Sequence, residues 1–198
     1  MANPKVFISS TFYDLHQVRK DVAVFIQEYG FDHILFEDGQ IPYGAFHAPA
    51  ESCYEEVDLC DILISIIGGR LGSSSAQSPY SVSQAELRRA LEKGKQVYIF
   101  IAKSVHTEYE TYKVNKDNNF VMRFADDPQV YEFLSELYDR PKNNAIFSFE
   151  TSQDMINILR KQWAGLFHRL LSNQQREAFP QTAGHPAFEK IRSLLSGC

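Results

Sequence analysis

The chain alternates between short apolar runs and longer segments whose apolar residues recur every three or four positions. Residues 62–67 (ILISII) and 97–101 (VYIFI) are almost continuously apolar, which is typical of parallel strands covered on both faces. Residues 5–9, 33–37 and 145–149 are shorter apolar runs next to turn-forming residues. The pattern therefore predicts five strands.

Segments with helical periodicity separate these runs. The stripe from Leu15 to Tyr29 has apolar residues at helical spacing and stops at Gly30. Further helices are predicted at residues 49–59, 83–91, 105–113 and 127–138, and from residue 151 onward. Strands alternating with helices at this spacing predict an α/β fold, three-layered and flavodoxin-like, around a five-stranded parallel sheet. Its core is predicted to contain Leu15, Val22, Ile26, Leu63, Ile64, Ile66, Leu87, Leu91, Val97 and Ile99.

The 198 residues suffice for one domain, expected over residues 1–173. Residues 174–198 are expected to form a C-terminal extension or linker with a short amphipathic helix. The apolar content of 44% and the aromatic content of 13% are those of a globular protein.

Charge and composition exclude several classes of function. The net charge of −5 argues against a nucleic-acid partner. The absence of a basic leader followed by a long apolar run argues against export or membrane insertion, so we expect a cytoplasmic protein. Three cysteines without disulfide or zinc spacing fit a reducing compartment. The six histidines show no i, i+4 pair, so no metal is expected.

Glu86 is the main candidate for chemistry. At 100° per residue it lies roughly 90° from the centre of the face formed by Ser83, Leu87, Ala90 and Leu91. We therefore expect it at the border between core and solvent. Its helix follows the loop after the third strand, the edge where open α/β sheets bind ligands.

The loop after the first strand is rich in hydroxyl groups. Ser9, Ser10 and Thr11 are suited to hydrogen bonds with ribose or phosphate, and Phe12 is suited to packing against a base. The alternative is that these residues only shape the entry to the next helix.

A glycine-rich turn follows the third strand. Gly68 and Gly69 would let the backbone approach a pyrophosphate while Arg70 pairs with it. The alternative is a tight turn with a structural salt bridge, and no Walker motif is present. In the turn-rich loop after the second strand, Asp38 and Tyr43 either flank the site or form an assembly surface; we favour assembly.

Four stretches of the chain resemble the DUF4062 family, which is TIR-like and belongs with TIR domains and nucleoside 2-deoxyribosyltransferases. They are residues 6–15 (VFISSTFYDL), 36–44 (FEDGQIPYG), 52–73 (SCYEEVDLCDILISIIGGRLGS) and 81–101 (SVSQAELRRALEKGKQVYIFI). The resemblance covers residues 4–103 and extends loosely to about residue 172.

Three of these stretches are similar to motifs of TIR domains. Residues 6–9 look like the first TIR box and residues 38–44 like its BB loop, while residues 85–87 match the helix that bears the catalytic glutamate of NAD-cleaving TIRs. The Trp that often precedes that glutamate is replaced by residues 80–83 (YSVS), and residues 72–79 are Ser-rich instead of aromatic. These departures bear on how a nicotinamide ring would be stacked.

The resemblance implies a TIR-like enzyme that cleaves NAD+ at the nicotinamide–ribose bond, giving ADP-ribose or a cyclised or base-exchanged derivative. The transition state is oxocarbenium-like, and a carboxylate beside the ribose stabilises its charge. Glu86 is then catalytic, and the expected substrate-binding residues are Ser9, Ser10, Thr11, Phe12, Asp38, Tyr43, Gly68, Gly69, Arg70 and Ser83. NAD+ serves as substrate, and no cofactor is expected.

The resemblance also implies a biological setting. Such a domain acts as effector or signal producer in immune or antiphage defence, as a homo-oligomer assembled through its TIR-like surface. It often precedes NTPase and repeat domains in a longer protein. Two other functions stay open: nucleoside 2-deoxyribosyl transfer, with the glutamate attacking the sugar, and a non-catalytic interaction module.

Overall fold

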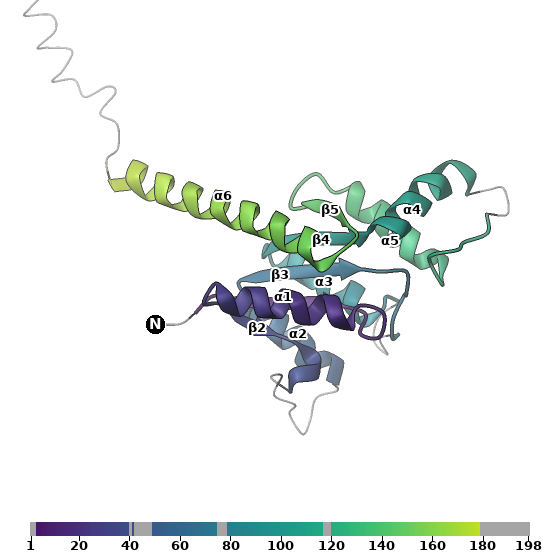
Figure 1. Ribbon diagram of the computed structural model, residues 1–198, viewed down its shortest axis with the longest axis horizontal. Helices are drawn as coiled ribbons and strands as arrows, with labels where there is room; N and C mark the ends of the chain where they lie inside the picture. Colours follow the sequence, from purple (N-terminus) through teal and green to yellow (C-terminus); the bar gives the residue numbers. More distant parts are fainter. Residues whose placement is uncertain (1–2, 40, 42–48, 75–78, 117–119, 179–198) are drawn as a thin grey trace, which may run out of the picture. The chain divides into compact units, whose positions relative to one another are not determined.

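The computed structural model describes residues 3–39, 41, 49–74, 79–116 and 120–178 (Figure 1). The chain divides into two compact units, Met1–Ile156 and Asn157–Cys198. The first unit contains the complete sheet, and the described part of the second continues the helix α6 (Ser152–Ala178). The domain boundary expected after residue 173 stays a prediction.

The first unit is built on a five-stranded sheet in the order β2-β1-β3-β4-β5, and every pair of neighbouring strands is parallel. The strands are β1 (Lys5–Ser10), β2 (Asp32–Ile34), β3 (Ile62–Ile67), β4 (Gln96–Ala102) and β5 (Ile146–Phe149). This confirms the predicted flavodoxin-like α/β fold. The two edge strands are the shortest, with three residues in β2 and four in β5.

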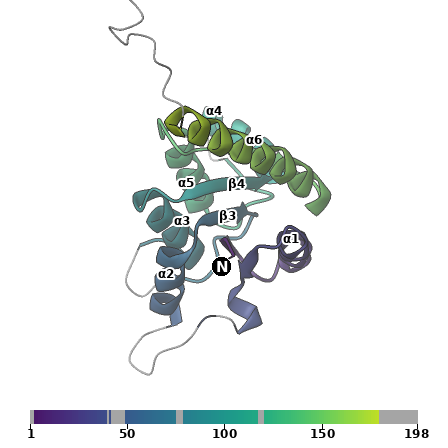
Figure 2. The same ribbon diagram turned by 90° about the vertical axis from the view of Figure 1, so that its left-hand side faces the viewer.

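Helices cover both faces of the sheet. Figure 2 shows α1 on one side of β3 and β4, and α2 and α3 on the other. The helices of this unit are α1 (His16–Glu28), α2 (Pro49–Leu59), α3 (Val82–Glu92), α4 (Lys103–Asn115), α5 (Pro128–Tyr138) and the first turn of α6. Right-handed crossovers require this arrangement, because the chain reverses direction along the sheet after β2.

The core follows the alternation of side chains along the strands. Leu63 packs in the cluster shared with α2 and α3, whereas its neighbours Ile62 and Ile64 point to the opposite face. Each of the ten residues predicted to be core is at most 6% exposed. The helical phases inferred from the sequence are therefore confirmed, including that of α3.

The second strand and the first helix differ from their predicted limits. The strand ends at Ile34, and Phe36–Asp38 form a 3₁₀ turn instead of continuing it. This turn directs Glu37 back toward the buried Arg19, a pairing that an extended strand would not give. The helix begins at His16, one residue after the predicted start of its apolar stripe at Leu15, and no described side chain caps it.

Candidate active site

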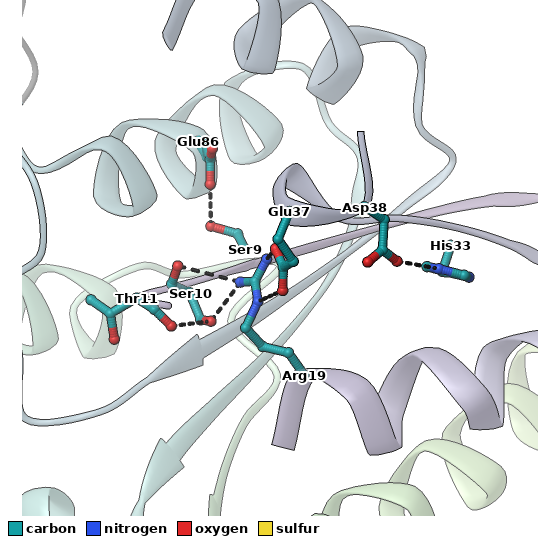
Figure 3. Close-up of polar contacts among 8 residues, drawn as sticks. All are labelled: Ser9, Ser10, Thr11, Arg19, His33, Glu37, Asp38 and Glu86. Carbon is teal, nitrogen blue, oxygen red and sulfur yellow. Dashed lines mark hydrogen bonds and ion pairs between the residues drawn. The ribbon is translucent and has the colours of Figure 1, made fainter. Parts of the chain in front are cut away.

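The Ser9 hydroxyl and the Glu86 carboxylate meet at the carboxyl end of β1. Ser9 Oγ donates a hydrogen bond to Glu86 Oε2 at 2.6 Å and lies 3.3 Å from the Ser83 carbonyl oxygen (Figure 3). Both side chains are buried, with Ser9 1% and Glu86 6% exposed. Two residues that the sequence predicted to act on a substrate are thus hydrogen-bonded to each other.

The start of α3 fixes Glu86 in this position. Ser81 caps the helix by accepting a hydrogen bond from the Gln84 backbone N–H, and the Gln84 side chain accepts one from the Ser81 N–H in return. The capping box sets the first turn of the helix, so that Glu86 faces the sheet beside Leu87 and Ala90.

Glu86 is more deeply buried than the sequence suggested. We expected a residue at the border of core and solvent; instead α2 and β1 enclose the carboxyl group, because Cys53 on α2 faces it. Burial raises the pKa of Glu86 from 4.5 to about 7, and the Ser9 hydrogen bond and the positive charge of Arg19 only partly oppose this. Near neutral pH the group therefore exchanges between charged and neutral forms.

A second polar cluster contacts the end of β1 from the opposite face of the sheet. Arg19 on α1 forms a bidentate ion pair with Glu37, with both N–O distances at 2.7 Å, and its third nitrogen donates to Ser10 Oγ at 2.7 Å (Figure 3). Sequence reasoning missed this cluster. The available signal was an arginine within the apolar stripe of α1, between Leu15 and Val22.

A small depression opens at the carboxyl ends of β1 and β3. Its volume is about 340 Å³, counting space open to solvent. It is lined by Thr11, Ser65, Ile66, Ile67, Gly68, Arg70, Leu71, Ser83, Gln84, Val130 and Phe133. Among these lining residues Arg70 carries the single formal charge, and three others present hydroxyl groups. Such a lining suits a ligand that combines an anionic group with a sugar.

Glu86 itself does not line this depression. Ser83, one helical turn before it, does, and Ser65 is the register partner of Ser9 across β1 and β3. The buried carboxylate is therefore not part of the lining, and a substrate in the depression reaches Glu86 only after a local rearrangement.

The glycine turn after β3 is shaped by close neighbours. A Cβ atom at Gly69 would lie 1.7 Å from the Phe124 carbonyl oxygen, and one at Gly68 would lie 2.5 Å from Asp14 Oδ2. Asp126 secures the turn by donating from its N–H to the Gly69 carbonyl and accepting from the Leu71 N–H, both at 2.9 Å. These contacts support the structural alternative for both glycines, while Arg70 stays exposed at the depression.

The remaining predicted site residues are spread over the neighbouring surface. Phe12 is 37% exposed and contacts Tyr13 and His16 at its ring edges. Ser10 points away from Glu86 toward Arg19, and Asp38 pairs with His33 at 3.1 Å (Figure 3). Neither Phe12, Ser10 nor Asp38 lines the depression. Tyr43 lies outside the described residues.

Glu108 on α4 is a second residue that sequence reasoning missed. Its carboxylate accepts hydrogen bonds from three consecutive backbone N–H groups, those of residues 123–125, and from the Tyr131 hydroxyl. Burial disfavours the charged form, but these hydrogen bonds outweigh it and leave the pKa of Glu108 below its usual value. Glu108 thereby fixes the turn that packs on Gly69. A single Glu on an amphipathic helix gives no signal of this in sequence.

In the described part of the chain, no group of three or more His, Cys, Asp or Glu side chains is placed to hold a metal ion. None of the described helices combines the length and apolar character needed to cross a bilayer.

Together the fold and the polar pair define a class: flavodoxin-like α/β domains with a buried carboxylate at the carboxyl edge of the sheet. Comparison with protein families gives the particular family. The DUF4062 family, described as a domain of unknown function, matches residues 5–164, and the chain belongs to it.

Comparisons with individual proteins are sparser. No curated protein matches the chain. Among solved structures, the chain is similar to the CMP N-glycosidase BcmB of Clostridium botulinum, with a TM-score of 0.43 and 14% sequence identity. The alignment covers 80% of this chain and 98% of that one.

Proposed function

We propose that this domain is a TIR-like enzyme that cleaves the N-glycosidic bond between nicotinamide and ribose in NAD+. The observation that carries the proposal is the buried Glu86 carboxylate, bonded to Ser9 behind the depression that contains Arg70. The product is ADP-ribose or a cyclised or exchanged derivative, formed in immune or antiphage defence.

The chemistry suits such a carboxylate. Pyridinium is already a good leaving group, so the main requirement is stabilisation of positive charge on the ribose as the bond breaks. An ionised carboxylate in a site of low dielectric supplies this far better than one in water. Because Glu86 is close to half ionised near neutral pH, the active form is accessible without a large energetic cost.

Access to Glu86 requires a structural change. Since 6% exposure of Glu86 leaves no room for a ribose, we infer that the catalytic form differs locally from the one described. Self-association of the domain through the loop that follows Asp38 is the proposed cause of that change. Ser9 would then exchange its hydrogen bond with Glu86 for one with a substrate hydroxyl.

The remaining predicted contacts complete the proposal. Thr11 and Ser83 line the depression and are suited to the ribose hydroxyls, while Arg70 is suited to the pyrophosphate. Phe12, exposed beside this edge, is available to a base. Deoxyribosyl transfer uses the same carboxylate as a nucleophile, so substrate choice separates the two reactions.

A non-catalytic interaction module is the second candidate. The observation that favours it is that Glu86 is enclosed and already satisfied by Ser9, as expected of a structural core carboxylate. In that case Glu86→Gln leaves every function of the domain intact.

The test is turnover with defined substrates. The chain, at high concentration, is incubated with NAD+ or with a 2′-deoxynucleoside plus a free base, and products are separated by chromatography. Release of nicotinamide that is lost in Glu86→Gln supports the proposal, and base exchange on the deoxynucleoside alone supports the transferase. If the self-associated chain turns over neither substrate, the result favours the non-catalytic interaction module.

A further inference from the structure

The end of β1 is held from both faces of the sheet. Consecutive strand residues point in opposite directions, so Ser9 faces α3 and Ser10 faces α1. Ser9 Oγ donates to Glu86, whereas Ser10 Oγ accepts from Arg19 and donates to the Thr11 carbonyl oxygen at 2.8 Å. Any displacement of this strand end therefore changes contacts on both faces.

On the α1 face, the Arg19 guanidinium uses all three of its nitrogen atoms in hydrogen bonds. The side chains of Arg19 and Glu37 are 4% and 13% exposed. Nε and Nη2 of Arg19 donate to the two carboxylate oxygens of Glu37, and Nη1 reaches both Ser10 Oγ, at 2.7 Å, and the Ser10 carbonyl oxygen, at 3.4 Å. One guanidinium thus joins the 3₁₀ turn after β2 to the last residue of β1. A planar fork does this where a lysine would not.

We propose that Arg19 and Glu37 are positioning residues: their ion pair holds the carboxyl end of β1 and thereby fixes the Ser9 hydroxyl against the Glu86 carboxylate. The proposal rests on the proposed function for its catalytic meaning. The structural connection between the Arg19–Glu37 ion pair and Glu86 does not depend on that function. Three successive contacts, from Glu37 to Arg19, from Arg19 to Ser10 and from Ser9 to Glu86, thereby connect the 3₁₀ turn to the carboxylate.

The charges around Glu86 define how the pair acts. Among the described residues, the Ser9 hydroxyl on β1 contacts it, and the Cys53 thiol on α2 lies near it and near the Glu56 carboxyl. The Arg19 guanidinium acts on it only through its charge, from α1 on the other face of the sheet. Ser9 and Arg19 favour the charged form of Glu86 and lower its pKa, against the larger effect of burial. Glu37 neutralises Arg19, and so limits this effect.

The two partners separate positioning from charge. Arg19→Gln removes a positive charge and frees Ser10, so Glu86 should titrate at a higher pH on either account. Glu37→Gln breaks the same bidentate pair but leaves the Arg19 charge uncompensated; charge alone would lower the pKa of Glu86, whereas a weakened Ser9 hydrogen bond raises it. Loss of one hydrogen bond to a carboxylate moves its titration by about one pH unit.

The experiment is a carbon-13 NMR titration of the Glu86 carboxyl group in the intact chain, assigned with Glu86→Gln. The two single variants are compared with the double variant Arg19→Gln/Glu37→Gln, which keeps the domain free of an unpaired buried charge. The matched control is Arg89→Gln/Asp58→Asn, which removes another bidentate pair, between α3 and α2. Upward shifts in both single variants and in the double variant, with no shift in the control, support the proposal.

An unchanged Glu86 titration in both single variants, or a downward shift in Glu37→Gln, which the charge of Arg19 explains without any positioning, would overturn it. The readout does not need turnover, so it separates the proposal from the proposed function. Titration shifts in a chain that never cleaves NAD+ support the positioning of Glu86 and refute the reaction. In a chain that does cleave NAD+, the acidic limb of kcat should move with the titration while KM stays constant.

Discussion

The Ser9 hydroxyl lies 2.6 Å from the Glu86 carboxylate, although the two residues are 77 positions apart in the chain. The contact joins the end of β1 to the second turn of α3. This contact belongs both to the packed core and to the proposed catalytic site, because the burial of Glu86 in the core also raises its pKa.

Glu86→Gln should abolish NAD+ cleavage without unfolding the domain. The amide keeps the size of the side chain but cannot carry the negative charge that stabilises the ribose, and loss of one such group lowers rates on the order of 10²–10³-fold. Nicotinamide release per chain measures the effect, with circular dichroism to verify folding. The control is Glu92→Gln, at the exposed end of the same helix. A folded Glu86→Gln chain that retains more than about a tenth of the activity would contradict the assignment.

The same substitution should stabilise the domain at alkaline pH. The folded pKa of Glu86, about 7, is above its ordinary value of 4.5, so the native state binds the proton more tightly than the unfolded state. Stability of the wild type therefore falls as pH rises from about 4.5 to about 7, and Glu86→Gln escapes this loss. The difference in free energy of unfolding at pH 8 should reach about 3 kcal/mol. Urea denaturation across this range gives the measurement, and parallel curves for the two proteins would refute it.

Glu108→Gln should loosen the turn that packs on Gly69. Both carboxylate oxygens of Glu108 accept hydrogen bonds, and an amide offers only one acceptor atom. We expect a loss of about 1–3 kcal/mol in free energy of unfolding, the usual effect of leaving a donor without its partner. Glu110→Gln, on the same helix but half exposed and paired with Lys113 at the surface, is the matched control and should cost about 0.5 kcal/mol or less. Equal losses in the two variants would show that Glu108 has no special role.

Gly69→Ala should destabilise the domain and displace the turn that bears Arg70. The added Cβ atom would lie 1.7 Å from the Phe124 carbonyl oxygen, so one of the two backbones must move. Overpacking of this kind costs about 1–3 kcal/mol. Thermal unfolding measures the loss. Gly165→Ala is the control, since nothing lies within 4 Å of its added Cβ, and it should be neutral or stabilising.

Activity should depend on self-association, because Glu86 is enclosed in the described form of the chain. Turnover per chain should rise with protein concentration or crowding, and replacement of Pro42 or Tyr43 should lower it with little change in melting temperature. Both residues lie outside the described part of the chain. Specific activity that stays constant over an about hundredfold dilution, with the chain monomeric throughout, would refute this prediction.

Periodicity alone predicted most of the architecture. The nearly continuous apolar runs of β3 and β4 and the apolar stripe on α3 are typical of strands covered on both faces and of the helices that cover them, and the predicted core residues there are buried. The second strand was predicted too long because Phe36 and Glu37 continue its composition. What ended it was a tertiary contact, the ion pair of Glu37 with Arg19, which local propensity does not contain.

The candidate site was predicted less completely. Glu86 and Ser9 were each named from the sequence, but their direct contact depends on the register of β1 against β3 and on the capping of α3. Arg19 and Glu108 were missed because each acts through partners distant in sequence, in segments where a charged residue on an amphipathic helix is ordinarily a solvated one. Such roles become visible only when the partner segments are placed together.

The short strands at the two sides of the sheet limit how copies of this domain can join. β2 offers three residues and β5 four, and very short edge strands disfavour extension of the hydrogen-bond ladder by a neighbouring chain. We therefore expect the proposed self-association to use contacts between helices and loops, with side chains setting its specificity. An assembly of that kind can form and dissolve with concentration, and it avoids the fibrous growth that strand addition would bring.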